Sequence, residues 1–251
     1  MAFALEPLPP SAYRITVVLP VFSEEDSVRE VLAGLREILG PRLEEVLIVL
    51  SPQSGPGSRA VCERLAREDA RVRIQLQQKN PGLGNALREG YAAARGNLIL
   101  NIDSDGEMEL ETVRRMLAKM EAAGCALVVA SRWMAGGGFS GYSPVKYVLN
   151  WGFQQLFRVL FWTRVNDLTY GFKLMRSELA RGIAWEGTRH EIACETTLKP
   201  IRLGVPVAAV PSRWTARTRG ASKNSFWRTF RYVAMALKIF FRGVEFKPPE
   251  A

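Results

Sequence analysis

Cysteine and histidine are scarce in this sequence. Its 251 residues include three cysteines, Cys62, Cys125 and Cys194, and one histidine. The cysteines lie far apart and none belongs to a CxxC pair, so the sequence supports neither a disulfide framework nor a zinc site. We expect three reduced, buried thiols, as in a cytosolic protein.

Long apolar runs are absent as well. A membrane-spanning helix needs about 18 to 20 consecutive apolar residues. The two best candidates, residues 147–162 and 226–241, are both interrupted by polar or charged side chains. The first residues of the chain do not combine a basic region with an apolar one, as a secretory signal does. We therefore expect a chain that does not cross a bilayer.

The composition is that of a globular protein, with 47% hydrophobic and 24% charged residues. At about 150 residues per domain, the length predicts one large domain or a domain with an appendage. We place the domain at residues 1–224 and a basic C-terminal helix and tail at 225–251. The net charge is +9, and the 11 basic and 2 acidic residues from Lys199 onward account for all of it. Such a field attracts nucleic acid, anionic lipid and phosphorylated substrates alike, so charge does not choose among them.

The first half of the chain alternates short, β-branched apolar runs with helical segments. The runs are residues 15–19, 46–50, 72–76, 97–102 and 126–130, and the helical segments are 24–39, 58–67, 82–94 and 110–122. Near-continuous apolar strands that are each followed by a helix predict an α/β fold with a mostly parallel sheet and helices on both faces. Ligands in such folds bind at the carboxyl ends of the strands. We therefore expect one rim to be lined by residues 20–25, 51–57, 79–85 and 103–108.

The alternation stops after Ala130. A glycine-rich segment at 135–141 leads to an aromatic helix, a strand-like piece at 170–175 and a helix near 189–203. For Trp151, Trp162 and Trp227 the ordinary interpretation is core packing, and it suits Trp151 better than Trp227. The last helix, at 226–241, carries an aromatic and aliphatic stripe with arginine and lysine beside it. This composition is typical of a helix in the interface plane of an anionic bilayer. The alternative is that the stripe packs on the domain and only its charges are exposed.

Two acidic residues, Asp103 and Asp105, directly follow the fourth apolar run. Carboxylates at i and i+2 beyond a strand can both turn toward one hard cation, and Mg²⁺ and Mn²⁺ prefer oxygen ligands that they share with phosphates. The pair therefore predicts a site for a divalent cation and a diphosphate. A solvated acidic turn is the alternative, because Asp-Ser-Asp-Gly is also good loop chemistry.

Several short segments stand in a characteristic order. They are 18–25 (VLPVFSEE), 79–87 (KNPGLGNAL), 101–105 (NIDSD), 131–137 (SRWMAGG), 166–174 (NDLTYGFKL) and 217–223 (RTRGASK). In order and spacing they resemble the family 2 glycosyltransferases, and in particular the polyprenyl-phosphate sugar transferases, the group that includes dolichol-phosphate mannose synthase. The resemblance covers about residues 14–225. Each segment is weak alone, but the set is specific.

The resemblance implies the GT-A fold of nucleotide-diphospho-sugar transferases and an inverting, metal-dependent reaction. A sugar would move from a nucleotide diphosphate sugar, GDP-mannose or a UDP-sugar, to a polyprenyl phosphate. The protein would be cytoplasmic and peripheral at the inner face of the membrane, with a membrane protein as a further candidate partner. Nucleic acid is not expected, because the acidic rim would repel a phosphate backbone.

The resemblance also assigns roles to residues of this chain. Asp103 and Asp105 are expected to hold Mg²⁺ or Mn²⁺, which makes Asp105 a catalytic residue. Basic side chains are expected to stabilise the leaving diphosphate, and these are Arg132, Arg217 and Lys223. The residues expected to bind the donor are Pro20, Phe22, Glu24, Ser51, Gln53, Asn80, Gly84, Asp103 and Ser104.

Two further acids have open roles. Glu195 stands at a family-matching place, where it positions the acceptor, orients Arg217, or only holds its helix through a salt bridge. Asp167 suits either the site or a helix cap or turn. A hydroxyl acceptor would need a carboxylate base, whereas a phosphate acceptor is already ionised.

One departure from the family concerns the second strand. In the family this strand ends in an acidic pair that helps to hold the base and ribose of the donor, but here residues 50–54 are LSPQS and contain no carboxylate. Ser51 and Gln53 remain as hydrogen-bonding groups, so the base of the donor stays open. Two other functions are therefore kept. One is a soluble glycosyltransferase acting on a hydroxyl of a saccharide or small molecule, and the other is a nucleotide-sugar-binding protein with reduced turnover.

Overall fold

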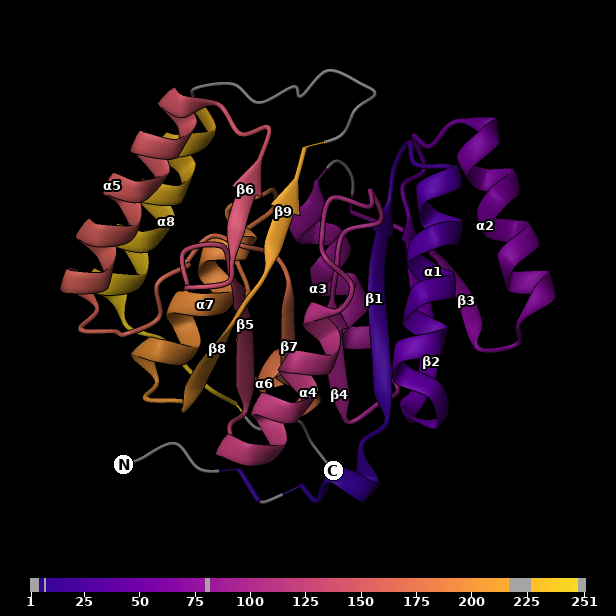
Figure 1. Cartoon of the computed structure of the whole chain (residues 1–251), viewed down its shortest axis with the longest axis horizontal. Coiled ribbons are helices and arrows are strands. Elements are labelled where there is room, and N and C mark those ends of the chain that lie inside the picture. Colours follow the sequence, from indigo (N-terminus) through magenta and orange to yellow (C-terminus); the bar gives the residue numbers. More distant parts are fainter. Residues whose placement is uncertain (1–4, 7, 80–81, 217–226, 248–251) are drawn as a thin grey trace.

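The computed structural model describes residues 5–6, 8–79, 82–216 and 227–247. A seven-stranded sheet forms its centre (Figure 1), in the order β3-β2-β1-β4-β7-β5-β8. Its strands are β1 (Ile15–Val21), β2 (Leu43–Leu50), β3 (Val72–Leu76), β4 (Leu98–Asn101), β5 (Leu127–Ser131), β7 (Lys173–Arg176) and β8 (Val207–Pro211). β7 runs antiparallel to β4 and β5, and the other neighbours are parallel. The expected α/β fold with a mostly parallel sheet is confirmed.

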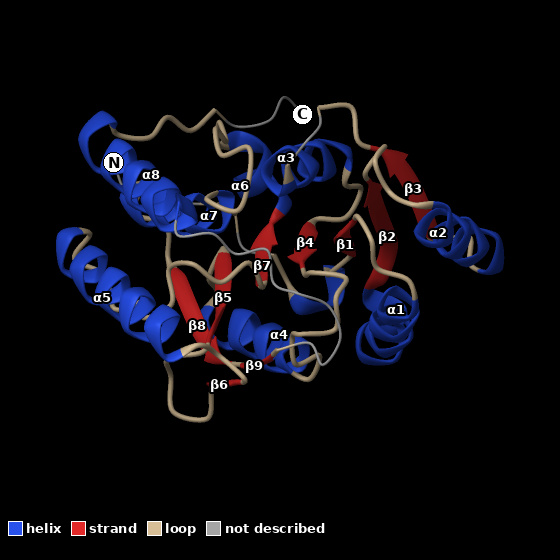
Figure 2. Ribbon diagram, turned by 90° about the horizontal axis from the view of Figure 1, so that it is seen from above, coloured by secondary structure: helices blue, strands red, loops and turns tan. Residues whose placement is uncertain are grey.

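Helices cover both faces of the sheet (Figure 2). One face carries α1 (Asp26–Leu39), α2 (Pro56–Glu68) and α4 (Thr112–Ala123), and the other carries α3 (Leu83–Ala93), α6 (Ser177–Gly182) and α7 (Ile192–Arg202). α5 (Pro144–Leu160) and α8 (Trp227–Arg242) belong to the second layer and pack against each other at one end of the molecule. The short 3-10 helices are η1 (Pro10–Ala12) and η2 (Gly40–Arg42).

The central strand β1 shows why the apolar runs become strands. Successive side chains of a strand point to opposite faces of the sheet. Val17 and Leu19 lie in the core beneath α1 and α4, whereas Val18 lies in the core beneath α3. All three are fully buried. A continuous apolar run is therefore what a strand covered on both faces requires.

The second half of the chain contains strands that the sequence did not indicate. These are β8 and the two strands of a small parallel sheet, β6 (Gly138–Ser140) and β9 (Arg213–Thr215). All three are short and incompletely buried, so they leave no clear alternation. The strand-like piece at 170–175 ends in β7, whose reversed direction brings its first residue to the edge where β4 and β5 end. The boundary expected between residues 224 and 225 lies outside the described residues.

The three cysteines are free and buried, as expected. Burial raises the pKa of the Cys62 thiol to about 11. Burial also raises the pKa of Cys125 and of Cys194. The three thiols lie in separate places: Cys62 in α2, Cys125 just before β5 and Cys194 in α7.

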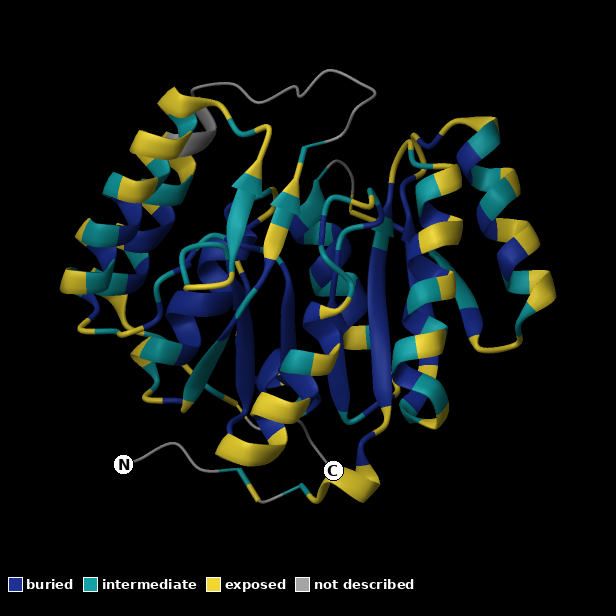
Figure 3. Cartoon of the chain, in the orientation of Figure 1, coloured by how far each residue is buried: buried dark blue, intermediate teal, exposed yellow. Residues whose placement is uncertain are grey.

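α5 and α8 carry many exposed residues (Figure 3), and several of these are large apolar ones. Trp151, expected in the core, is instead 51% exposed, because α5 turns Phe153 and Phe157 inward. The stripe expected at the membrane was Phe226, Phe230, Val233, Leu237 and Phe241, and of these Val233 packs against the core instead. The inward side chains are Met235, Ala236 and Ile239, and the exposed apolar ones are Phe230, Leu237 and Phe241. Phe226, the first residue of the expected stripe, lies outside the described residues.

No helix in the described part of the chain is both long enough and apolar enough to cross a membrane.

Candidate active site

The carboxyl ends of β1, β2 and β4 meet at one rim, as the parallel order predicts. The Ser51 N–H donates to the Val21 carbonyl at 3.0 Å. From the other side, the Ser104 hydroxyl donates to the Pro20 carbonyl at 2.7 Å. Pro20 and Val21 thus lie between the loop that follows β2 and the acidic loop that follows β4. Three of the four loops expected at the rim are joined directly by these hydrogen bonds.

The acidic loop holds Asp103 and Asp105 half-buried, on either side of the buried Ser104. Asp105 Oδ1 accepts a hydrogen bond from the Glu107 N–H at 3.0 Å. The chain turns at Gly106, where φ is +75° and a side chain would be strained. The Ser104 hydrogen bond to β1 therefore fixes the loop between the two carboxylates.

The donor atoms of this loop fit a hard divalent cation. Two partly exposed carboxylates are the oxygen ligands that Mg²⁺ and Mn²⁺ prefer. Among the described residues, no cluster of three or more histidine, cysteine, aspartate or glutamate side chains is placed to hold a metal. A cation held by the pair would therefore take its remaining ligands from water or from a phosphate.

Buried polar atoms lie near the acidic pair. Burial is the main cause that raises the pKa of Tyr91, and the charges of Glu195 and Asp103 add to it. Tyr91 Oη and Asn101 Oδ1 are both buried, and neither has a hydrogen-bond partner among the described residues. A buried polar atom without a partner costs about 1–3 kcal/mol, so both atoms favour a bound water or ligand group. Tyr91 could not be singled out from the sequence, because it occupies an apolar position of α3.

The expected donor-binding residues of the β1 loop differ in what they present. The Glu24 carboxylate turns back on its own loop and accepts from the N–H groups of Phe22 and Ser23, both at 2.9 Å. Phe22 itself is exposed. The Pro20 carbonyl is taken by Ser104. This loop therefore exposes the Phe22 ring, and the hydrogen bonds to Glu24 hold the turn that carries it.

The loop after β2 lacks the acids of the family and is closed by hydroxyl and arginine contacts. Ser51 is buried and its Oγ accepts from the Gln53 N–H at 3.2 Å. Arg59 donates to the carbonyls of Ser54 and Pro52, at 3.0 and 2.5 Å. Gln53 is exposed at the rim. Its amide is thus the polar side chain that this loop exposes.

Gly82, just before α3, and Gly84, in the first turn of α3, belong to what we call the glycine-rich loop, and this loop packs on the segment before α7. A side chain at Gly84 would collide with the Gly187 carbonyl, and one at Gly82 with the Thr188 carbonyl. The Asn85 N–H donates to the same Thr188 carbonyl at 3.3 Å. The two glycines are therefore required by close backbone approach. Asn80, expected to bind the donor, lies outside the described residues.

Glu195 supports the segment on which the glycine-rich loop packs. Its fully buried carboxylate accepts from the Glu186 and Gly187 N–H groups, both at 2.8 Å. It also pairs with Lys199, one helical turn on, at 2.6 Å. Of the roles kept open for Glu195, the helix salt bridge is present among the described residues, whereas Arg217 lies outside them. Its hydrogen bonds to the loop add a contact that the sequence could not indicate.

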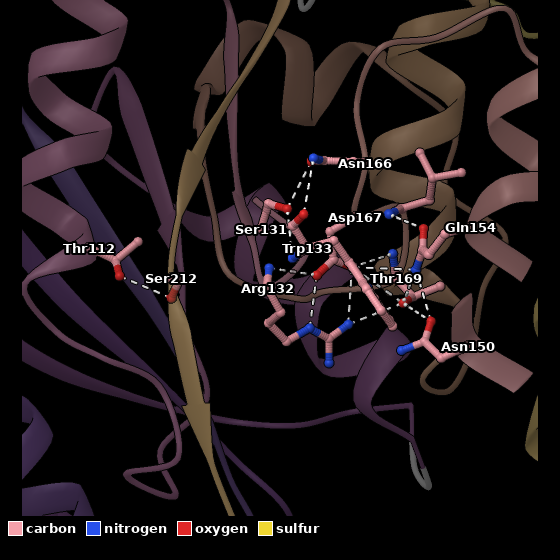
Figure 4. Close-up of polar contacts among 11 residues, drawn as sticks. Thr112, Ser131, Arg132, Trp133, Asn150, Gln154, Asn166, Asp167, Thr169 and Ser212 are labelled. Atoms are coloured by element: carbon pink, nitrogen blue, oxygen red, sulfur yellow. Dashed lines mark hydrogen bonds and ion pairs between the residues drawn. The ribbon is translucent and has the colours of Figure 1, made fainter. Parts of the chain in front are cut away.

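Arg132 and Asp167 form a buried ion pair (Figure 4). The guanidinium donates from Nε to Asp167 Oδ2 at 2.8 Å and from Nη2 to Oδ1 at 3.0 Å. The ring centre of Tyr170 lies 4.4 Å from the guanidinium carbon, and that of Phe139 lies 5.0 Å from it. Burial by itself lowers the pKa of Arg132, but the Asp167 charge and hydrogen bonds outweigh it, and the pKa is raised.

The guanidinium fork of Arg132 is therefore occupied by Asp167, where the sequence led us to expect a fork open toward a diphosphate. Asp167 is fully buried and also accepts from the Thr169 N–H at 3.3 Å, which agrees with its alternative role in a turn. Gln154 of α5 completes the cluster by accepting from the Leu168 N–H at 2.7 Å. In the sequence Gln154 stood out only as a polar break in an apolar helix.

Arg217 and Lys223 lie outside the described residues. The described chain before them ends beside the acidic loop. The Thr215 N–H donates to the Glu107 carbonyl at 3.0 Å, and Trp214 Nε1 donates to the Glu107 carboxylate at 3.0 Å. β9 therefore lies against the loop that carries Asp103 and Asp105.

Residues 16–183 match the profile of Glycosyl transferase family 2. The polyprenol monophosphomannose synthase of Mycolicibacterium smegmatis is 26% identical over 219 residues, which cover 84% of this chain and 81% of that protein. A dolichyl-phosphate beta-glucosyltransferase of Trichomonas vaginalis is 27% identical over 183 residues, which cover 68% of this chain and 54% of that longer protein.

Solved structures agree on the fold. Glucosyl-3-phosphoglycerate synthase from Mycobacterium tuberculosis in complex with UDP has a TM-score of 0.69 at 17% identity, over 96% of this chain and 89% of that one. Its complex with Mn²⁺, UDP-glucose and glycerol 3-phosphate has a TM-score of 0.69 at 18% identity, over 96% and 88%. Taken with the family match, this likeness in fold leads to one assignment. The chain belongs to glycosyltransferase family 2 and is a glycosyltransferase with a GT-A-like fold.

Proposed function

We propose that this enzyme transfers a sugar, with inversion, from a nucleotide diphosphate sugar to a polyprenyl phosphate, and that the transfer depends on a divalent metal. Two of the curated relatives are named for transfer to polyprenol or dolichyl phosphate. The half-buried Asp103 and Asp105 support the donor class, because such a pair suits a cation shared with a diphosphate. When bound there, Mg²⁺ or Mn²⁺ would supply positive charge to the leaving diphosphate.

The observation that supports a phosphate as the acceptor is the burial and hydrogen bonding of the Glu195 carboxylate. A hydroxyl acceptor must lose its proton to a base near the reacting carbon. Glu195, the acid that the family pattern offers for such a role, is fully buried and occupied by two backbone N–H groups and Lys199. It is not placed to take a proton from an acceptor. A phosphate is already ionised, so this geometry favours a polyprenyl phosphate over a saccharide hydroxyl.

We assign supporting roles to the other expected residues. Phe22 and Gln53 are exposed at the rim and suit contact with the base and ribose. Ser51, Ser104 and Glu24 shape the loops around them. Gly84 lets the glycine-rich loop, to which we assign donor binding, approach the segment held by Glu195. Arg132 is a positioning residue that ties the end of β5 to the segment before β7, which leaves Arg217 and Lys223 to meet the diphosphate or the acceptor phosphate.

A second candidate function rests on the loop after β2. Without a carboxylate there, the ribose hydroxyls of a donor lose an acidic acceptor, and Ser51 already accepts from Gln53. This favours a nucleotide-sugar-binding protein with reduced turnover, if donor affinity is retained and transfer is not.

A thermal-shift screen tests the proposal. GDP-, UDP- and other nucleotide sugars are added with Mg²⁺, with Mn²⁺ or with a chelator. A donor at 100 times its Kd should stabilise the protein by about 2.7 kcal/mol, and each kcal/mol raises Tm by about 2–4 °C at this size. The best donor is then tried with a polyprenyl phosphate and with the matching polyprenol. Transfer to the polyprenol alone would refute the phosphate acceptor, and binding without transfer would favour the second candidate.

We further propose that the enzyme works as a peripheral protein at the cytoplasmic face of a membrane. A polyprenyl chain stays in lipid while its phosphate must reach Asp103 and Asp105. The basic C-terminal part of the chain supports attraction to anionic lipid. A membrane-protein partner remains a candidate for the same reason. Nucleic acid is not proposed, because the acidic loop would repel a phosphate backbone.

Arg217→Ala is expected to lower kcat by about 100-fold and to change the donor KM much less. The reason is that a cation facing the leaving diphosphate acts on charge that grows in the transition state. Steady-state kinetics at saturating donor measure the effect, with Arg219→Ala as a control of equal charge change. Unchanged kcat with a lower Tm would assign Arg217 to the fold.

A further inference from the structure

The outer side of α5 is apolar and exposed, which is unusual for a helix that packs on a domain. Its inner side buries Phe153, Gln154 and Phe157. Exposed apolar side chains recur along its outer side at helical spacing and continue just past its end. They are Val145, Val148, Trp151, Leu156, Val159 and Trp162. Val159 is 76% exposed and Trp162 is 96% exposed. Single exposed apolar residues are ordinary, but a row of this length marks an interaction surface.

The exposed Trp162 has a strained, left-handed backbone conformation. Its φ is +50°, and it is the only described residue other than glycine with a positive φ. The Thr163 N–H donates to the Arg158 carbonyl at 3.0 Å and the Trp162 N–H to the Val159 carbonyl at 3.1 Å. These two hydrogen bonds close a Schellman motif, and Trp162 occupies the left-handed position that glycine normally takes. Nothing in the packing explains a tryptophan there, because its side chain is almost wholly exposed. Strain of this kind is characteristic of functional positions.

α8 continues the same surface. It packs beside α5 through Phe153 on Tyr232 and Phe161 on Phe240, with ring centres 6.2 and 5.7 Å apart. Its exposed residues Phe230, Leu237 and Phe241 form a stripe at helical spacing. Figures 1 and 2 both place α5 and α8 side by side at one end of the molecule.

The charge of the two helices is of one sign. Residues 144–164 and 227–242 contain seven basic residues and no acidic one. Arg164, Arg231 and Arg242 are exposed. Aromatic and aliphatic side chains mixed with arginine and lysine suit the boundary between an anionic headgroup layer and the acyl chains. Tryptophan is the side chain best suited to that boundary, because its ring is apolar and its N–H is polar.

We propose that the exposed faces of α5 and α8, with Trp162 as an anchor, dock flat on an anionic lipid bilayer. We call these residues the docking face: Val145, Val148, Trp151, Leu156, Val159, Trp162, Phe230, Leu237 and Phe241. The proposal adds to the proposed function the surface that contacts lipid. It rests on that function only for the reason why the enzyme would bind lipid. Binding to lipid by itself needs neither donor nor acceptor.

Sedimentation with vesicles of phosphatidylcholine, with and without phosphatidylglycerol, tests the docking face in the absence of any substrate. The parent protein should bind vesicles that contain phosphatidylglycerol, and binding should weaken with salt. Trp162→Gly should lower the partition coefficient by about tenfold, because a large apolar side chain no longer enters the lipid. The same variant should keep or raise Tm, since glycine takes the left-handed conformation without strain.

Val159→Glu is a second variant that separates lipid binding from folding. Val159 is exposed, so the change should leave Tm unaltered and abolish most binding. Leu76→Ser is the matched control, because Leu76 is also an exposed apolar residue but lies at the end of β3, outside the docking face. Its binding should equal that of the parent.

Several outcomes would overturn the proposal. They are failure of the parent to bind anionic vesicles, equal binding by Trp162→Gly, or a dimer without lipid that Val159→Glu converts to a monomer. The last would make a second copy of the chain the occupant. A transfer assay with a short, water-soluble acceptor phosphate keeps the two proposals apart. Vesicle binding without transfer to any acceptor would refute the proposed function and leave the docking face standing.

Discussion

Asp105→Ala is expected to abolish metal-dependent donor binding and to lower kcat/KM by about 1000-fold. A hard cation contributes several kcal/mol of charge stabilisation to a leaving diphosphate, and each 1.36 kcal/mol is worth about tenfold in rate. Removing one of the two carboxylates would leave a cation bound there with a single carboxylate ligand from the acidic pair. Calorimetric titration of the donor with Mn²⁺ and with a chelator measures the loss of binding.

A second substitution tests the charge of Asp105 separately from the hydrogen bond that holds its turn. Asp105 Oδ1 accepts from the Glu107 N–H, and an asparagine oxygen can accept the same hydrogen bond. Asp105→Asn should therefore keep the loop and lose most donor affinity. Glu111→Ala, an exposed acid at the start of α4, is the control for a change of net charge. If Asp105→Asn binds the donor in Mn²⁺ as tightly as the parent, the acidic pair is only a turn.

Asp167→Ala is expected to cost about 3–5 kcal/mol in the free energy of unfolding. The substitution leaves Arg132 as an uncompensated buried charge, because its side chain is 9% exposed and its partner is fully buried. At about 2–4 °C per kcal/mol, Tm should fall by roughly 6–20 °C. Urea or thermal unfolding of the metal-free protein measures the effect without any reference to activity.

Two comparisons sharpen this test. Glu68→Gln removes one partner of the exposed pair Arg64–Glu68 and should cost about 1 kcal/mol or less. Arg132→Met combined with Asp167→Leu removes both buried charges and should recover much of the lost stability. A loss below 1 kcal/mol for Asp167→Ala would contradict the burial of the pair.

The sequence predicted the first half of the fold well because its strands are covered on both faces. A strand such as β1 is a continuous apolar run, and its position fixes the loop that follows. The rim formed by the loops after β1, β2 and β4 was therefore predictable before any coordinates. β7 was harder to recognise, because it begins with Lys173 and ends with Arg176. Both are buried, and Lys173 donates to Thr196 Oγ1 of α7 at 2.6 Å.

The site contacts beyond the rim depend on partners that the sequence does not place together. Arg132 and Asp167 are 35 positions apart, and nothing in either segment indicates that their side chains form an ion pair. The roles of Glu195 and Gly84 likewise depend on the segment 186–188 that lies between them in space. Trp151 was misplaced for a related reason. Spacing alone shows that a helix has an apolar face, but not whether that face is covered.

The reactivity of the three buried thiols would report local opening of the structure around them. Burial raises the pKa of the Cys62 thiol to about 11, so the reactive thiolate is disfavoured at neutral pH, and burial also shields the sulfur from reagents. Modification must then wait until the surrounding structure opens. Because Cys62 lies within α2, Cys125 just before β5 and Cys194 within α7, the order in which they react would show which part of the enzyme opens first.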